Sequence, residues 1–89
     1  MKWKTVYIEW LDSKGITTSW ESLDGMEPLQ PTLCYTVGFL LEETETFKTV
    51  AQSVSDGQVL GRTTIPCCSI QKIVEVWLLE NADRNGLLY

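Results

Sequence analysis

Short segments in which apolar and polar side chains alternate limit most strongly what this chain can fold into. In the first of them Val6, Ile8 and Trp10 fall on one face of an extended backbone. Alternation with a period of two residues is typical of a β-strand with one buried face. Such segments, or short runs rich in valine and threonine, span residues 4–12, 32–42, 46–55, 58–65 and 70–79. No sustained apolar stripe has helical spacing, so an all-β chain is predicted.

Turn-forming residues separate the five segments. Asp56-Gly57 is a strong hairpin signal, and Pro66 ends the fourth segment because proline cannot donate to a strand ladder. Residues 67–69 are then predicted to form a single helical turn. Residues 13–31 contain two glycines and two prolines, and they predict a long loop with one short strand around residues 17–22. Loops of this length in a small domain are often functional.

Five short strands without a helix predict a small antiparallel barrel or roll of the SH3-like or OB-like kind. Residues 1–80 form a single β domain in this prediction, and residues 81–89 form a polar tail. The segment 32–42 is apolar on both faces and is the predicted central strand. Gly38 within it indicates a bulge, a bend or a close approach of another group. The segment 70–79 is also apolar on both faces, so either it lies mid-sheet or its outer face meets another protomer.

The balance of charges narrows the class of partner. The 89 residues include 12 acidic and 7 basic side chains, a formal net charge of −5. This argues against duplex nucleic acid or an anionic membrane surface, because phosphate binding depends on clustered lysine and arginine. No apolar run reaches the ~18 residues of a membrane span, and the first residues lack a signal-peptide core. A cytoplasmic protein is predicted.

The three cysteines also suit a cytoplasmic protein, where thiols stay reduced. An odd count with one adjacent pair fits no disulfide framework. Cys34, Cys67 and Cys68 are predicted to be small buried fillers, and a redox or metal role of the adjacent pair is the alternative.

The sequence offers few residues that are suited to catalysis. The chain contains no histidine, which removes Ser-His-Asp and Cys-His pairs and histidine-based zinc sites. Glu42 and Glu43 are adjacent, but they fall in a polar turn where nothing raises the pKa of a carboxyl for acid catalysis. A non-enzymatic protein with no cofactor and no metal is predicted. Catalysis through Cys67 or Cys68 is the enzymatic alternative.

Two tryptophans near the long loop are the first candidates for ligand binding. Trp10 and Trp20 flank Asp12 and Ser13, and an indole face stacks well on a flat ligand such as a purine. The long loop and the two indoles would then form one wall of a pocket. In the structural alternative Trp10 belongs to the core, Asp12 and Ser13 cap a turn, and Trp20 packs under the loop.

Polar residues on the later strands complete the candidate site. Arg62 offers a planar guanidinium that suits a phosphate or carboxylate ligand, although such a residue is commonly solvated or paired with an acid. Thr36 and Thr64 offer hydroxyl groups, and threonine is also an ordinary strand former.

Three short motifs resemble a group of small tailed-bacteriophage proteins of mostly unassigned role. They are the opening Val6-x-x-x-Trp10-x-Asp12-Ser13 with Trp20 seven residues on, the segment Val37-Gly38-Phe39-Leu40, and the segment Ile65-Pro66-x-x-x-Ile70-x-x-Ile73. The resemblance covers about residues 4 to 78. Ser69 stands where that group often has alanine, which leaves any chemistry open. Small acidic phage proteins include oligomeric anti-defence sponges that sequester nucleotide signals between protomers.

The resemblance therefore implies a phage anti-defence protein, located in the cytoplasm of an infected bacterium. The predicted function is sequestration of a small nucleotide-derived signal, such as a cyclic dinucleotide or an ADP-ribose derivative, in a pocket between protomers of a homo-oligomer. The alternative is a protein–protein interaction module that inhibits a host protein or serves in phage assembly. Neither nucleic acid nor a membrane is an expected partner.

Overall fold

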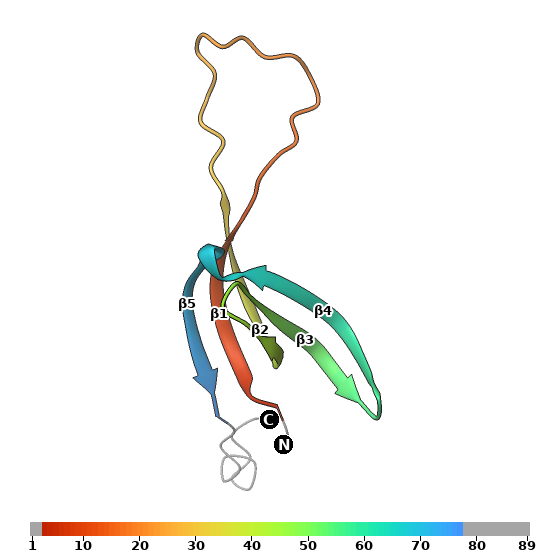
Figure 1. The fold of residues 1–89 in the computed structure, drawn as a ribbon. Helices are drawn as coiled ribbons and strands as arrows, with labels where there is room; N and C mark the ends of the chain where they lie inside the picture. Colours follow the sequence, from red (N-terminus) through yellow and green to blue (C-terminus); the bar gives the residue numbers. More distant parts are fainter. Residues whose placement is uncertain (1–2, 78–89) are drawn as a thin grey trace, which may run out of the picture.

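The computed structural model describes residues 3–77 as five β-strands and one short 3₁₀-helix (Figure 1). The elements are β1 (Thr5–Asp12), β2 (Thr32–Glu43), β3 (Phe47–Ser55), β4 (Gln58–Pro66), η1 (Cys67–Ser69) and β5 (Ile70–Val76). All neighbouring strands are antiparallel, and the single sheet has the order β4-β3-β2-β1-β5. The all-β prediction is confirmed, with β2 as the central strand. The predicted tail of residues 81–89 lies outside the described residues.

Closure of the sheet is where the structure departs from the predicted barrel. Among the described strands β4 and β5 are the two edges, and no ladder joins them, so a closed barrel is not confirmed. However, η1 connects Pro66 to Ile70, and four residue steps span at most about 14 Å. The two edges therefore approach each other at this end of the sheet. Figure 1 shows the β3–β4 hairpin diverging from β5 toward the opposite end, which leaves the sheet open there.

The core lies on one face of the coiled sheet. Its cluster of buried apolar side chains comes from β1, β3 and β4 and consists of Val6, Ile8, Val50 and Ile65. Ala51, next to Val50 on β3, is also buried, on the other side of that strand. Trp10, Leu40 and Ile70 pack against this cluster and are partly buried. The predicted inward face of the first strand is confirmed.

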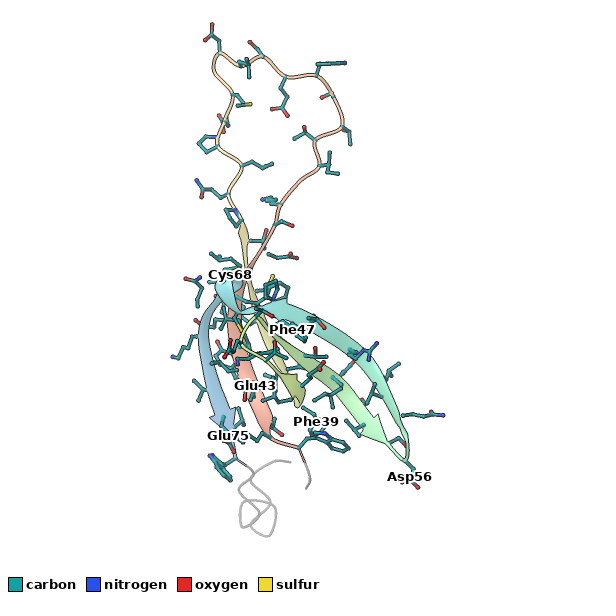
Figure 2. The ribbon with its side chains drawn as sticks, in the orientation of Figure 1. Phe39, Glu43, Phe47, Asp56, Cys68 and Glu75 are labelled. Atoms are coloured by element: carbon teal, nitrogen blue, oxygen red, sulfur yellow. The ribbon has the colours of Figure 1, made fainter. Side chains whose placement is uncertain are left out.

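The alternation within residues 58–65 predicts that Val59 and Ile65 both point inward, and for Val59 this prediction is wrong. Its side chain is 43% exposed, whereas that of Ile65 on the same strand is fully buried. The reason is the position along β4, because Val59 belongs to the part of the hairpin near the turn at Asp56, remote from the core (Figure 2).

The long strand β2 changes its pairing partner along its length. Residues 32–39 pair with β1, and residues 39–43 pair with β3, with an irregularity between Leu40 and Glu42. Gly38 lies where the two ladders meet. A Cβ atom at this position would lie 2.8 Å from the carbonyl oxygen of Ala51 and 3.3 Å from Cβ of Val50. The close approach predicted from this mid-strand glycine is confirmed.

Residues 13–31 form an arm that extends away from the sheet (Figure 1). Every residue from 11 through 33 is exposed. The short strand predicted around residues 17–22 is wrong, since the arm contains no strand. A strand needs a ladder partner, and the arm lies beyond the ends of β1 and β2, where no other strand is present to pair with it.

Candidate functional site

The seven residues predicted to bind a ligand fall in separate parts of the fold. Trp10 and Thr36 lie on the core face of β1 and β2. The indole N–H of Trp10 donates to Oγ1 of Thr36 at 2.9 Å, and the ring packs against the core cluster. This bond satisfies two polar groups in a half-buried position, which is the ordinary requirement for such groups. The structure thus places Trp10 and Thr36 in the framework that supports the arm.

Asp12 and Ser13 lie where the arm leaves the sheet. Asp12 is the last residue of β1 and pairs with Thr32, the first residue of β2. Both Asp12 and Ser13 are exposed. They are close in sequence to Trp10, whose side chain is held in the framework described above.

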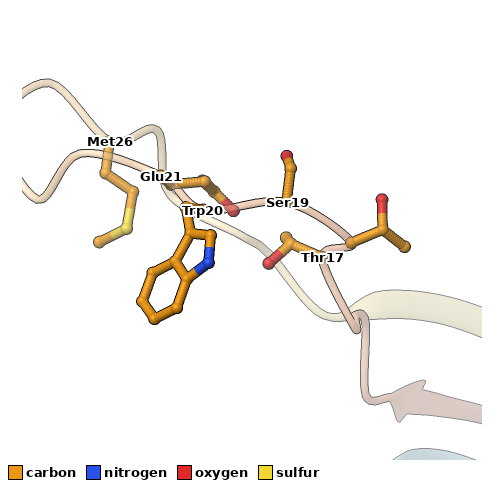
Figure 3. A pocket seen from close by; sticks show the side chains of 6 residues that line it. Thr17, Ser19, Trp20, Glu21 and Met26 are labelled. Carbon is orange, nitrogen blue, oxygen red and sulfur yellow. The ribbon is translucent and has the colours of Figure 1, made fainter.

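Trp20 lies within the arm, and its side chain is fully exposed. It helps to line an open hollow of about 440 Å³ whose other lining residues are Thr17, Thr18, Ser19, Glu21 and Met26. Figure 3 shows the indole between the side chain of Met26 on one side and that of Thr17 on the other. The hollow therefore combines a flat aromatic face, a thioether, three hydroxyl groups and one carboxylate. It contains one of the seven predicted residues.

Arg62 and Thr64 lie on β4. Arg62 is exposed and is opposite Ala51 in the ladder with β3. The hydroxyl oxygens of Thr64 and Thr49 are 2.9 Å apart and share a hydrogen bond. Thr49 is a buried residue. β4 is an edge of the sheet, whereas the arm extends from the ends of β1 and β2. Within one protomer, therefore, Arg62 does not line the hollow beside Trp20.

Two charged contacts on the sheet shift pKa values. The Tyr7 hydroxyl donates to the carboxylate of Glu9, which raises the pKa of Tyr7 to about 12 because its ionisation would lose this bond and place two anions together. Lys48 Nζ lies 2.8 Å from Glu43 Oε2, and this bond lowers the pKa of the Glu43 carboxyl and raises the pKa of Lys48. A lowered carboxyl pKa is opposite to what a general acid near neutral pH requires.

The prediction that the cysteines are buried fillers is wrong for Cys68, because this residue lies in the short turn η1 at the surface. Cys34 and Cys67 are half-buried and Cys68 is exposed, and all three are free thiols. Cys67 Sγ lies 3.8 Å from the carbonyl oxygen of Thr44, and the Cys67 N–H donates to Thr46. Within residues 3–77 no group of three or more acidic, cysteine or histidine side chains is arranged to hold a metal ion.

Comparison with known proteins gave no relatives: no family model, curated protein or solved structure matches this chain. In the described part of the chain no helix has the length and apolar character needed to cross a membrane.

Sequence reasoning singled out the outer face of residues 70–79, and the structure extends that face across β5, β1 and β2, on the side of the sheet opposite the core. On β2 this face carries Leu33, Tyr35 and Val37, and all three are exposed. The smaller residues of the strand, including Thr36 and Gly38, point toward the core side. Gly38 was the available signal, because a glycine in close contact with another strand marks the packed face and leaves the larger side chains outside.

Proposed function

We propose that this protein is a non-enzymatic interaction module that binds a partner protein through its arm, residues 13–31. The sheet, which approximates an SH3-like roll, would serve as the rigid support. The observation that carries the proposal is the complete exposure of the arm. It contains five large apolar side chains that the rest of the described chain leaves uncovered, and these are Ile16, Trp20, Leu23, Met26 and Leu29.

Free-energy considerations support a partner for the arm. Fixing a residue of backbone in one conformation costs about 1–2 kcal/mol, and no burial within the described chain offsets this cost over residues 13–31. An exposed cluster of apolar side chains rimmed by polar ones is typical of an interaction site. Tryptophan is also among the residues that contribute most to binding at protein interfaces. Trp20 is therefore the expected anchor.

Charges on the arm indicate the chemistry of the partner. Glu21, Asp24 and Glu27 lie among the apolar residues, and Lys14 is the basic residue of the arm. A complementary partner would offer an apolar groove with basic residues at its rim. The resemblance to small phage proteins remains a prediction, and under it the partner would be a host protein that is inhibited or a component of phage assembly.

The test is co-purification of the full chain from a bacterial host, comparing wild type with a Trp20→Ala variant. A Leu60→Ala variant is the matched control, because Leu60 is a 68% exposed apolar residue on β4, outside the arm. A partner retained by wild type and by the control but lost with Trp20→Ala supports the proposal. Hydrogen exchange of the complex should then show slower exchange at residues 13–31. A partner that leaves these amides unprotected would contradict an arm-mediated interaction.

A second candidate function is the sequestration of a nucleotide-derived signal, and the hollow beside Trp20 favours it. An exposed indole next to the hydroxyls of Thr17, Thr18 and Ser19 offers stacking and hydrogen bonds to a flat polar ligand. Since the hollow is open, a second protomer would have to close it, and Glu21 would require the phosphates to point away from the arm.

Calorimetry with cyclic dinucleotides and ADP-ribose derivatives tests this second candidate. Binding that is lost in Trp20→Ala, with the ligand recovered intact after heating the protein, would support sequestration. The absence of heat with every ligand would leave the protein-binding function as the better proposal.

A further inference from the structure

The outer face of β2, β1 and β5 carries an apolar surface that has no cover in the described chain. Pairing of the strands places Val37, Tyr7 and Val74 side by side in one row, with Tyr7 in the middle. Leu11 and Leu33 form a second pair toward the arm. The exposed apolar side chains of this outer face are Leu11, Leu33, Tyr35, Val37, Val74 and Val76.

This distribution is unusual for a sheet face in contact with water. Antiparallel sheets with one solvated face commonly place polar residues on it, in alternation with the buried ones. On the outer face, Val37 is 61% exposed and lies beside Tyr7, and Tyr35 is 65% exposed and lies beside Glu9. The β3–β4 hairpin exposes mainly polar residues, including Gln52, Ser53, Ser55 and Gln58, beside the apolar Val59 and Leu60 near its turn. The apolar outer face therefore needs an explanation of its own.

We propose that a second copy of this chain packs on the outer face, so that two sheets stack face to face around a two-fold axis. Stacked sheets pack about 10 Å apart with their facing side chains interdigitated. β5 is an edge strand with apolar residues on its outer side, and it lies on the same continuous face as β1 and β2. This inference does not depend on what the arm binds.

The local arrangement of charges on the outer face favours a second copy as the occupant. The chain has a formal net charge of −5, so two copies repel each other unless they meet at a surface that is locally neutral. In the outer face the polar positions flanked by the apolar rows are Glu9 on β1 and Lys72 on β5, which are partners in the strand register. Under two-fold symmetry, residue i of one copy contacts residue j of the other, and j contacts i. An axis between Glu9 and Lys72 then places each of these residues opposite its counter-charge in the partner.

The test begins with the mass of the full chain in solution, measured by light scattering or sedimentation over a range of concentrations. Wild type is expected at twice the 10.1 kDa of the chain. Val37→Lys, which places a charge in the central row, is expected to weaken the dimer at least about tenfold. Leu60→Lys is the control, since Leu60 is equally exposed but lies on β4, and its dimer should match wild type. The thermal unfolding of both variants verifies that they remain folded.

A charge-reversal experiment then tests the symmetry directly. Glu9→Lys and Lys72→Glu should each weaken self-association, because each brings like charges together across the axis. An equimolar mixture of the two variants should restore the dimer as a mixed pair, whose formation native mass spectrometry detects. Glu75→Lys is the matched control, because it makes the same change of charge on β5 but pairs with Val6, on the core side of the sheet. It should leave the dimer unchanged.

Two results would overturn the proposal. The first is a monomeric wild type at concentrations up to about 1 mM, the range of a weak contact, which would leave residues 78–89 of the same chain as the candidate cover. The second is a dimer whose strength is unchanged by Val37→Lys, which would place the interface elsewhere on the molecule.

Discussion

Substitution of Gly38 by alanine tests how closely β2 and β3 approach each other at this position. The added methyl group would lie 2.8 Å from the Ala51 carbonyl oxygen and 3.3 Å from Cβ of Val50. The first of these atoms belongs to the backbone of β3, so it moves only if the strand moves. Overpacking of this kind costs about 1–3 kcal/mol. Gly38 has no positive φ, so the substitution also restricts the unfolded chain and returns about 0.4–1 kcal/mol.

We therefore expect Gly38→Ala to lower the free energy of unfolding by about 1–2 kcal/mol. Thermal unfolding followed by circular dichroism should show a fall in Tm of about 4–8 °C for each kcal/mol. The urea midpoint should fall with the slope of the transition unchanged, since the same surface is exposed on unfolding. A variant as stable as wild type, or more stable, would refute the reasoning, because the restricted unfolded state would then be the only effect. Trimming Val50 should not rescue the variant, since the closest contact is with the backbone.

The remaining predictions concern Trp10, Trp20 and Tyr7. Trp10→Phe should lower the free energy of unfolding by about 1–3 kcal/mol, because it removes the bond to Thr36 and leaves space beside the core. Trp20→Phe should change the free energy of unfolding by less than about 0.5 kcal/mol, because this side chain is fully exposed. Urea unfolding measures the free energy for both variants. Equal losses of stability in the two would mean that the arm packs on the sheet. Tyr7 should ionise with a pKa of about 12, above its ordinary value of 10.0, so its stabilising contribution is complete below pH 10 and is lost as the pH rises through 12. Phenolate absorbance measures this titration, and Glu9→Gln should bring the pKa of Tyr7 back toward its ordinary value; an unchanged titration would show that the Glu9 carboxylate is not the cause.

Local patterns were enough to predict most of the strands. β1 was predictable because Val6 and Ile8 alternate with more polar residues, and the β3–β4 hairpin because Asp56-Gly57 favours a tight turn, where Gly57 has a φ of +68°. Both signals depend on residues near each other in sequence. The failure at Val59 has the opposite origin. The burial of Val59 depends on how far the β3–β4 hairpin extends beyond the core. The alternation of residues within one strand carries no information about that distance.

The candidate site was predictable only in part. The loop of residues 13–31 was predictable from its glycines and prolines, but the short strand expected within it is absent, and the exposure of Trp20 contradicts packing under the loop. Trp10 was assigned two alternative roles, and its bond to Thr36, 26 residues away, supports the structural one. Nothing in the local sequence indicates which strand lies beside β1, so this contact required the tertiary pairing.

By itself, the sequence determined the five strands of the sheet, the long loop of residues 13–31, the acidic charge and the lack of histidine-based chemistry, because each of these depends on composition or on neighbouring residues. The tertiary structure decided the strand order, the open edges and which face of β2 is buried. The physical reason is that both faces of β2 are apolar, so its own alternation does not choose between them. The choice follows from the close packing of Gly38 against β3, which turns the small side chains inward and leaves Leu33, Tyr35 and Val37 on the outer face.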